Sequence, residues 1–254
     1  MGSLKGKKAL VTGAEQGIGQ AVANLLAENG CDVAIHYYAS REMAEENANF
    51  TRSKGGRSDI FHADLTKEED AVAMVSAAAQ FLGGIDILVN NVGDLVKRKF
   101  LGEIDMDFWK RVYDINVTSA MMVTREALPY LEKNSDGASI INLASLAGRK
   151  GGHPGSLVYS TCKGAILTWT RALSNELSPK GIRVNAVAPG LILGTKFHAT
   201  HTTKESADET IKGIPLGRAG NPEDVARTIV FLASEYDGFI TGATIDINGG
   251  VYCA

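Results

Sequence analysis

The chain has 254 residues, of which 44% are hydrophobic and 22% charged, as in an ordinary globular protein rather than a disordered or fibrous one. A formal net charge of −3 argues against nucleic acid or an anionic membrane surface as a partner. The three cysteines are widely separated and lack metal-ligand spacing, which favours reduced thiols, no metal site and a cytoplasmic location. Apolar runs are too short to predict secretion or a membrane span.

The first half of the chain alternates short apolar runs with helical patterns. An apolar run ends in a glycine turn, and apolar residues then recur with helical spacing up to Gly30. The expected strands are 8–12, 33–36, 60–62 and 85–89, and the later expected helices are 41–54 and 67–82. This alternation predicts a doubly wound, Rossmann-type α/β fold, in which helices cover both faces of one parallel sheet.

The second half continues the same alternation, so residues 1–254 are expected to form a single domain. Asn221 and Pro222 have the residue types of a helix cap and first turn. Residues 191–220 have no strong period and are rich in small and polar residues, which predicts a mobile lid over a substrate site. The expected helices are 106–132, 159–177 and 223–234, and the expected strands are 138–144, 182–188 and 244–247.

Three glycines, Gly13, Gly17 and Gly19, separate the first strand from the first helix. Residues without Cβ permit a tight turn and close approach to a ligand, and the free N–H groups of a helix start attract phosphate. The turn therefore predicts a dinucleotide phosphate site, although a purely structural turn has the same composition.

Tyr159 and Lys163 are four residues apart in an expected helix, so both side chains lie on one face. A nearby ammonium favours the phenolate and is expected to lower the phenol pKa towards neutral pH. Ser145 is a candidate to hold a substrate carbonyl oxygen. The spacing by itself also fits an ordinary surface pair, so this interpretation needs support from the rest of the chain.

That support comes from an ordered set of motifs that resembles the short-chain dehydrogenase/reductase family over essentially the whole chain. The resemblance implies hydride transfer on nicotinamide, with Tyr159 as general acid or base and Ser145 orienting the carbonyl. Lys163 would bind the nicotinamide ribose and lower the tyrosine pKa, and Asn116 would hold a water that relays protons. The set is Thr12-Gly13-x3-Gly17-Ile18-Gly19, Asn90-Asn91-Val92-Gly93, Asn116, Ser145, Tyr159-x3-Lys163 and Pro189-Gly190.

The resemblance also implies cofactor contacts. Asp64, followed by Leu65, matches the residue that contacts adenine, although an aspartate capping the next helix would look the same. Val92 stands where the family usually has alanine, and the expected threonine after Pro189-Gly190 is displaced by one residue to Thr195. The remaining implied contacts are Gly13, Gln16, Gly17, Ile18, Gly19, Asn91, Gly93 and Ile192, together with Tyr159 and Lys163.

The end of the second strand bears on cofactor choice. Tyr37 takes the position at which NAD-preferring relatives carry aspartate, and Ser40 with Arg41 could receive a 2′-phosphate. NADP(H) is therefore slightly favoured over NAD(H). Against this, Gln16 and Tyr38 occupy positions at which many NADP-preferring relatives have a basic residue, and the acidic Glu15 lies nearby.

Two basic clusters, 97–99 and 149–150, follow strand ends and favour a small, anionic substrate, with surface solvation as the alternative. The segments 93–99 and 197–199 resemble bacterial reductases of keto-uronic acids from alginate breakdown. A 3-oxoacyl-carrier-protein reductase, with its acidic partner on the same loops, is an alternative, and a non-catalytic NADP-sensing regulator is another. Family members commonly form tetramers through the helices 106–132 and 159–177 and the last strand, so a homotetramer is expected.

Overall fold

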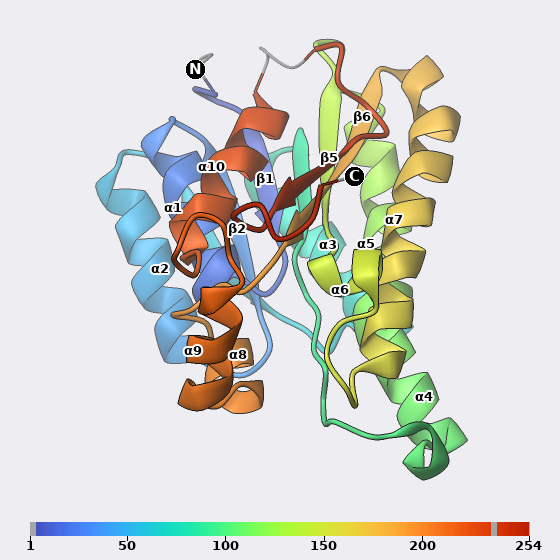
Figure 1. The fold of residues 1–254 in the computed structure, drawn as a ribbon. Helices are drawn as coiled ribbons and strands as arrows, with labels where there is room; N and C mark the ends of the chain where they lie inside the picture. Colours follow the sequence, from blue (N-terminus) through green and yellow to red (C-terminus); the bar gives the residue numbers. More distant parts are fainter. Residues whose placement is uncertain (1–3, 235–237, 254) are drawn as a thin grey trace.

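Seven parallel strands form the centre of the structure (Figure 1). The computed structural model describes residues 4–234 and 238–253. The strand order is β3-β2-β1-β4-β5-β6-β7, which confirms the predicted doubly wound α/β fold. The strands are β1 (Lys8–Val11), β2 (Asp32–Tyr37), β3 (Ser58–His62), β4 (Ile87–Asn90), β5 (Ala138–Leu143), β6 (Ile182–Pro189) and β7 (Thr244–Ile247).

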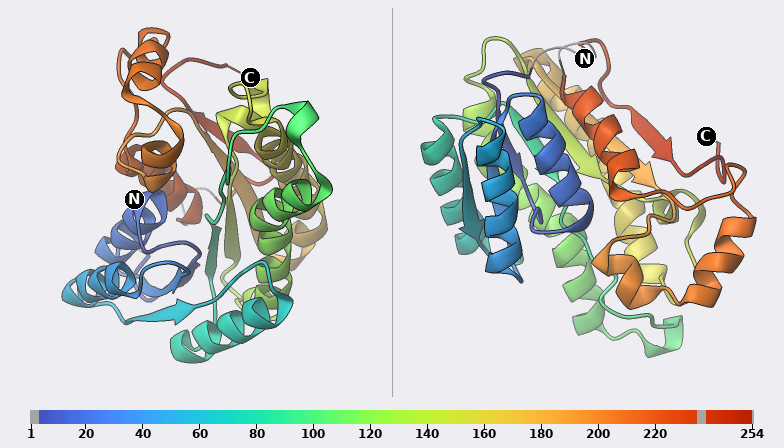
Figure 2. Two further views of the ribbon diagram at one scale, coloured as in Figure 1. Left: turned by 90° about the horizontal axis from the view of Figure 1, so that it is seen from below. Right: turned by 90° about the vertical axis from the view of Figure 1, so that its left-hand side faces the viewer.

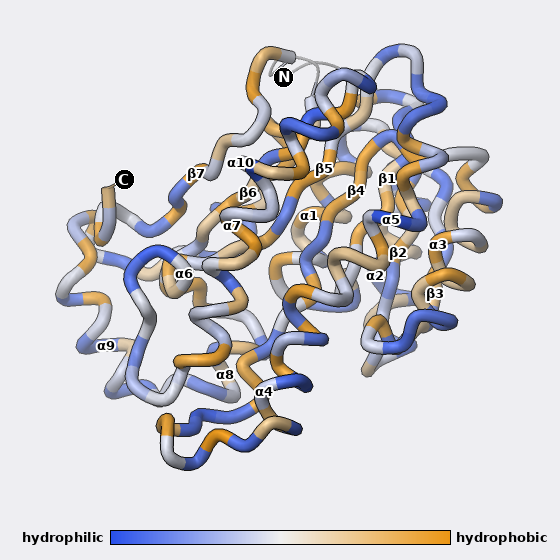
Figure 3. The backbone as a smooth tube through the Cα atoms, turned by 90° about the vertical axis from the view of Figure 1, so that its right-hand side faces the viewer, coloured by the Kyte–Doolittle hydropathy of each residue, from blue (hydrophilic) through white to orange (hydrophobic). Residues whose placement is uncertain are grey.

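Helices cover both faces of the sheet because successive strand residues point to opposite sides. In β1, Leu10 packs among residues of α3 and α5, while Val11 packs among those of α1, α2 and α10. Figure 2 shows these helices on the two sides of the sheet. Hydrophobic colour follows the central strands, and α9 is largely hydrophilic (Figure 3). The α-helices are α1 (Gly17–Glu28), α2 (Arg41–Ser53), α3 (Glu68–Leu82), α4 (Met106–Tyr113), α5 (Ser119–Leu131), α6 (Leu146–Lys150), α7 (Leu157–Leu177), α8 (Lys196–His201), α9 (Lys204–Lys212) and α10 (Pro222–Ala233). Within residues 4–234 and 238–253, none of these helices has the length and apolar character to cross a membrane.

The segment predicted as one long helix over 106–132 is helical without a break from Met106 to Leu131, but it contains a π-helical turn (Asp114–Thr118), not predicted, between α4 and α5. The Asn116 amide nitrogen donates to the carbonyl of Val112 at 2.8 Å and to that of Asp94 at 2.7 Å. A side chain that bonds the carbonyl four residues back competes with the helical ladder, which explains the local widening.

The composition of residues 191–220 predicted a segment without a regular period. The structure instead contains two helices there, α8 and α9. Both helices begin at threonine caps: Thr195 accepts from the His198 N–H, and Thr203 accepts from the Ser206 N–H. A bridge between Ile192 and Gly220 joins the ends of the segment. These helices are short and polar, so their signal lies in their caps rather than in a hydrophobic period.

The order of the strands reverses between β1 and β4, which is where ligands bind in open α/β sheets. The glycine turn follows β1, and residues 91–93 follow β4. Helices α4, α8 and α9 lie at this end of the molecule, at the bottom of Figure 1.

His36 on β2 fixes the glycine turn. The Gly13 N–H donates to His36 Nδ1 at 2.9 Å, and His36 Nε2 lies 3.2 Å from the Ala63 carbonyl oxygen. Since Nδ1 accepts, the proton of the neutral ring is on Nε2, which donates to Ala63. Burial lowers the pKa of His36 to about 4, outweighing the opposite effect of the Ala63 bond, and His62 lowers it slightly further.

We expect this buried histidine to make the fold sensitive to acid. The unfolded chain takes up the proton below about pH 6.5, whereas the folded chain resists it until about pH 4, so stability falls as the pH drops through this window. Over this window the pKa difference of His36 changes the free energy of unfolding by about 3 kcal/mol. His36→Asn keeps an acceptor for Gly13 but does not titrate, so its unfolding free energy should fall less steeply between pH 6.5 and 4.

Urea unfolding at several pH values measures these slopes. The exposed His153, changed to Asn, serves as the matched control and should keep the wild-type slope. Parallel curves for wild type and His36→Asn would contradict the assignment.

Candidate active site

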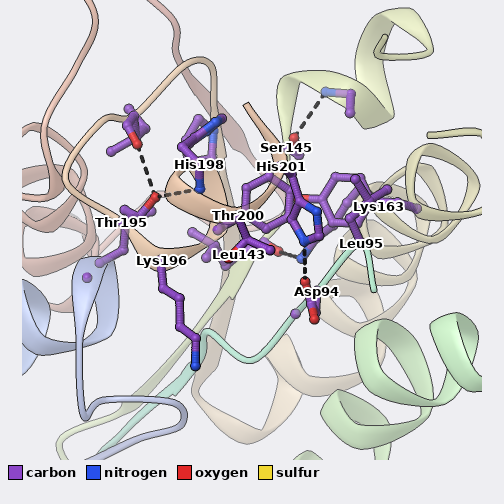
Figure 4. Close-up of a pocket in the computed structure, with 18 of the residues that line it drawn as sticks. Asp94, Leu95, Leu143, Ser145, Lys163, Thr195, Lys196, His198, Thr200 and His201 are labelled. Carbon is purple, nitrogen blue, oxygen red and sulfur yellow. Dashed lines mark hydrogen bonds and ion pairs between the residues drawn. The ribbon is translucent and has the colours of Figure 1, made fainter. Parts of the chain in front are cut away.

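A cavity of about 800 Å³ opens at the carboxyl ends of the strands. Its walls come from the loops after β1, β4, β5 and β6 and from α7 and α8, and Figure 4 shows part of them. This volume is in the range of small-molecule and cofactor sites. The structure therefore brings residues distant in sequence to one cavity at the switch point of the sheet.

Ser145, Tyr159 and Lys163 all line this cavity. The Lys163 Nζ donates to the Leu143 carbonyl at 2.7 Å and lies 5.7 Å from the centroid of the Tyr159 ring. Ser145 caps α6, where its hydroxyl oxygen accepts from the Ala147 N–H at 3.1 Å. Strand β5 thus ends in both the acceptor for Lys163 and the serine, while one face of α7 supplies the phenol and the ammonium.

Burial controls the protonation of this pair. It raises the pKa of Tyr159 to about 12; the Ser145 hydroxyl opposes the rise, and Asp94 and Cys162 add to it. Burial also lowers the pKa of Lys163 to about 8, with Cys162 opposing. Desolvation of the phenolate therefore dominates the pKa of this phenol, and the lowering by Lys163 that the family resemblance implies stays a prediction. Tyr159 is held as a neutral phenol, which is a proton donor.

Asn116 does not line the cavity but lies behind it. A Cβ on Gly93 would come within 2.8 Å of both the Asn116 Oδ1 and the Lys163 Nζ, so the amide oxygen and the ammonium face the same glycine. Asn116 Oδ1 is buried and has no hydrogen-bond partner among the residues that the structure describes. It therefore remains available as an acceptor next to Lys163.

The glycine turn lies at one end of the cavity, which Gly13, Gln16, Gly17 and Ile18 line. Gly19 does not line it, and it serves packing instead: a Cβ there would be 2.2 Å from the Gly13 carbonyl oxygen. Thr195 packs near Gly17, where a Cβ would meet its methyl carbon at 3.5 Å. The first turn of α8 thus lies against the predicted phosphate site.

Asp64 and Leu65 also line the cavity. Asp64 Oδ1 accepts from the Thr66 N–H at 3.1 Å and from its hydroxyl at 2.7 Å. Although burial opposes this, the Thr66 bonds and the charges of Lys67 and Arg111 hold the pKa of Asp64 below its usual range. The alternative of an Asp64 helix cap is wrong, because Lys67 occupies that position at the start of α3.

Three predicted cofactor contacts at the end of β2, namely Tyr37 and the possible 2′-phosphate contacts Ser40 and Arg41, lie outside the cavity lining. Tyr37 is buried in the core, Ser40 Oγ accepts from the Met43 N–H to cap α2, and Arg41 is exposed at the start of that helix. The strand end turns His36 and Tyr38 towards the cavity instead. The other predicted contacts do line it: Asn91, Val92, Gly93, Pro189, Gly190, Ile192 and Thr195.

Only part of each basic cluster faces the cavity. Arg98 and Lys150 line it, but Lys99 pairs with Asp105 at 2.9 Å and Arg149 pairs with Asp246 at 3.1 Å. Lys196 adds to the basic lining. His153, His198 and His201 line the cavity as well, but burial lowers the pKa of His198 to about 4, so this ring is neutral at pH 7. Among residues 4–234 and 238–253, no group of three or more histidine, cysteine or acidic side chains is arranged to hold a metal ion.

Helix α8 packs against Tyr159 and is bonded to the loop after β4. Phe197 packs on the Tyr159 ring at a centroid distance of 5.4 Å, and His201 Nε2 lies 3.1 Å from Asp94 Oδ1 (Figure 4). Arg98 donates to the carbonyls of Pro154 and His201, which ties the loop after β5 to α8. Sequence reasoning missed Asp94 and this role of Arg98, because the contacts join segments about 100 residues apart.

Comparisons with known proteins agree with this geometry. A family model described as "Enoyl-(Acyl carrier protein) reductase" matches residues 13–252. Glucose 1-dehydrogenase 2 of Bacillus subtilis is 34% identical, covering 98% of this chain and 95% of that protein. The 3-oxoacyl-[acyl-carrier-protein] reductase FabG of Staphylococcus epidermidis is 37% identical, covering 97% and 99%.

Among solved structures, the NADH-dependent reductase A1-R′ responsible for alginate metabolism superposes with a TM-score of 0.90 at 35% identity, covering 99% of both chains. The fold, the ordered motifs and these relatives lead to one conclusion. The chain belongs to the short-chain dehydrogenase/reductase family and is an oxidoreductase that uses NAD(P)(H) to interconvert CH–OH and C=O groups.

Proposed function

We propose that this enzyme reduces the carbonyl of a small, anionic substrate such as a keto sugar acid, with residues 1–254 as one catalytic domain and residues 191–220 as its lid. The observation that carries the proposal is the set of basic side chains around Tyr159. Arg98 and Lys150 line the cavity together with His153 and His201, while His198 adds no charge at neutral pH because burial lowers its pKa to about 4. The relative from alginate metabolism supports the same substrate class.

In this proposal Tyr159 protonates the carbonyl oxygen during reduction. Its raised pKa keeps the proton on the phenol until the oxygen becomes basic. Ser145 donates a hydrogen bond to the same oxygen, and the buried Lys163 ammonium stabilises the phenolate that forms. A nicotinamide dinucleotide supplies the hydride when bound.

Lys163 and Asn116 would return the proton. Lys163 has N–H groups beyond the one bonded to Leu143, and Asn116 Oδ1 is an unpartnered acceptor within the described residues. A water between them would satisfy both and lead towards solvent. This supports the proton relay that the family resemblance implies.

Residues along the cavity offer suitable contacts to each part of a nicotinamide dinucleotide. The glycine turn and the start of α1 offer N–H groups to the pyrophosphate, and Thr195 lies beside them. Asp64 and Leu65 would contact adenine, while Pro189 and Gly190 would border the nicotinamide. The slight preference for NADP(H) stays a prediction from sequence, although Ser40 and Arg41 lie outside the cavity lining.

A 3-oxoacyl-carrier-protein reductase is the second candidate, and the FabG relatives favour it. Beside the exposed Lys97, the side chains of Phe100, Leu101 and Met106 are 64%, 73% and 76% exposed, a combination that fits an acidic protein with apolar contacts. A non-catalytic NADP-sensing regulator is less well supported, because Ser145, Tyr159 and Lys163 share one cavity.

We expect Tyr159→Phe to lose most carbonyl reduction, by about 10²–10⁴-fold, because the ring remains but the proton donor is gone. Dinucleotide binding, measured by fluorescence titration, should persist. Tyr113→Phe, at a tyrosine outside the cavity lining, should keep wild-type turnover. Unchanged turnover in Tyr159→Phe would exclude the assigned role.

Substrate charge is tested by steady-state reduction of keto sugar acids, acetoacetyl thioesters and neutral ketones. Lys150→Gln should raise KM for the keto acids by about fivefold and leave neutral ketones unchanged, because one attractive charge is worth about 1 kcal/mol at such a site. Lys97→Gln removes the same charge outside the cavity and should have little effect on keto acids. Equal effects on charged and neutral substrates would reject the proposal, and a preference for thioesters would support the second candidate.

We also propose a cytoplasmic homotetramer. The free thiols of Cys31, Cys162 and Cys253 suit a reducing compartment. The side chain of Met121 on α5 is 39% exposed and Trp169 on α7 is only partly buried, which suits a helix-to-helix interface, whereas Met122, Ile166 and Leu167 are core residues. Light scattering should give about four times the 27.0 kDa chain mass, and a monomer would overturn this expectation.

A further inference from the structure

Glu15 in the glycine turn is a buried carboxylate without a function so far. Its relative exposure is 6%, and its side chain lines the cavity. Its Oε2 atom is buried and has no hydrogen-bond partner in the described part of the chain. An unpaired buried carboxylate oxygen is costly, so a partner is expected when the cavity is filled.

The surroundings of Glu15 contain little that would attract a second phosphate. The residue that follows it in the turn is the neutral Gln16, and the ring of His36 behind the turn is held neutral by its two hydrogen bonds. At the end of β2, Tyr38 faces the cavity and stacks on His62 at 6.2 Å, while Arg41 does not line the cavity.

Arg111 and Lys196 are two further cations of the cavity lining. Arg111 lines the cavity, but its charge acts on Asp64, a carboxylate already at this end. Lys196 follows Thr195, which packs near Gly17, and in Figure 4 it extends away from Ser145 and Lys163. Its place beside the turn fits the pyrophosphate that every nicotinamide dinucleotide carries, so it does not favour NADP over NAD.

We propose that Glu15 accepts a hydrogen bond from a hydroxyl of the adenosine ribose and excludes the 2′-phosphate, so that this enzyme prefers NAD(H) to NADP(H). This inference rests on the use of a dinucleotide and reverses the preference suggested by Ser40 and Arg41. The carboxylate that is missing at Tyr37 is supplied from the glycine turn instead. A buried carboxylate gains a partner from a ribose hydroxyl, whereas a phosphate brings a like charge into the same poorly hydrated space.

Fluorescence titration without substrate tests the inference through NADH and NADPH dissociation constants. Wild type should bind NADH at least 30-fold more tightly than NADPH. Glu15→Gln keeps the shape and removes the charge, so it should weaken NADH binding a few-fold and reduce the NADH preference at least tenfold. Glu42→Gln makes the same change at an exposed residue in the first turn of α2 and should keep the wild-type ratio.

Competition by ADP-ribose and by its 2′-phosphorylated form restricts the comparison to the adenosine half, and should show the same discrimination and the same loss of it in Glu15→Gln. Tighter NADPH binding by wild type, or an unchanged ratio in a folded Glu15→Gln variant, would overturn the inference. So would an equal shift in Glu42→Gln, which would indicate a general surface field. A shifted ratio together with absent carbonyl reduction would count against the proposed substrate and leave the inference standing.

Discussion

The burial of the Lys163 ammonium is the constraint on which the catalytic end of the molecule depends. The residue is 2% exposed, and an ammonium removed from water needs acceptors in fixed positions. Strand β5 supplies the Leu143 carbonyl at 2.7 Å, which sets α7 at a fixed height against the sheet. Because Tyr159 lies one turn earlier on the same helix face, the position of the phenol follows from the position of the ammonium.

The same constraint extends to the loop after β4 and to the π-helical turn between α4 and α5. Gly93 leaves room between the ammonium and the Asn116 amide, since a Cβ there would come within 2.8 Å of both groups. The Asn116 side chain in turn holds the Asp94 carbonyl at 2.7 Å, and Asp94 faces His201 of the lid helix. Hydrogen bonds thus link the π-helical turn to Asp94 and Asp94 to α8, whereas the buried ammonium and the Asn116 amide are related by their shared approach to Gly93.

Sequence predicted the features whose signals are local. The spacing of Tyr159 and Lys163 required only a helix, and the glycine turn required only its neighbours in the chain, so both were located correctly in the fold. The π-helical turn at Asn116 could not be predicted, because it depends on a competition between one amide and the helical ladder. The strand-end position of Arg149 predicted a residue beside the substrate, but its side chain pairs at 3.1 Å with Asp246, a partner 97 residues away that the local sequence does not indicate.

Protonation was the least predictable property, because it depends on how much water surrounds a group. The four-residue spacing correctly joined a phenol and an ammonium, but it implied a lowered phenol pKa where burial raises it to about 12. A raised pKa suits this phenol to the donation of a proton, which is the step that carbonyl reduction requires. A phenol that keeps its proton can donate as soon as a carbonyl oxygen gains charge, whereas oxidation of an alcohol needs the phenolate first. Formation of the phenolate requires a positive charge nearby to offset its desolvation. Lys163, whose pKa burial lowers to about 8, still carries that charge at neutral pH.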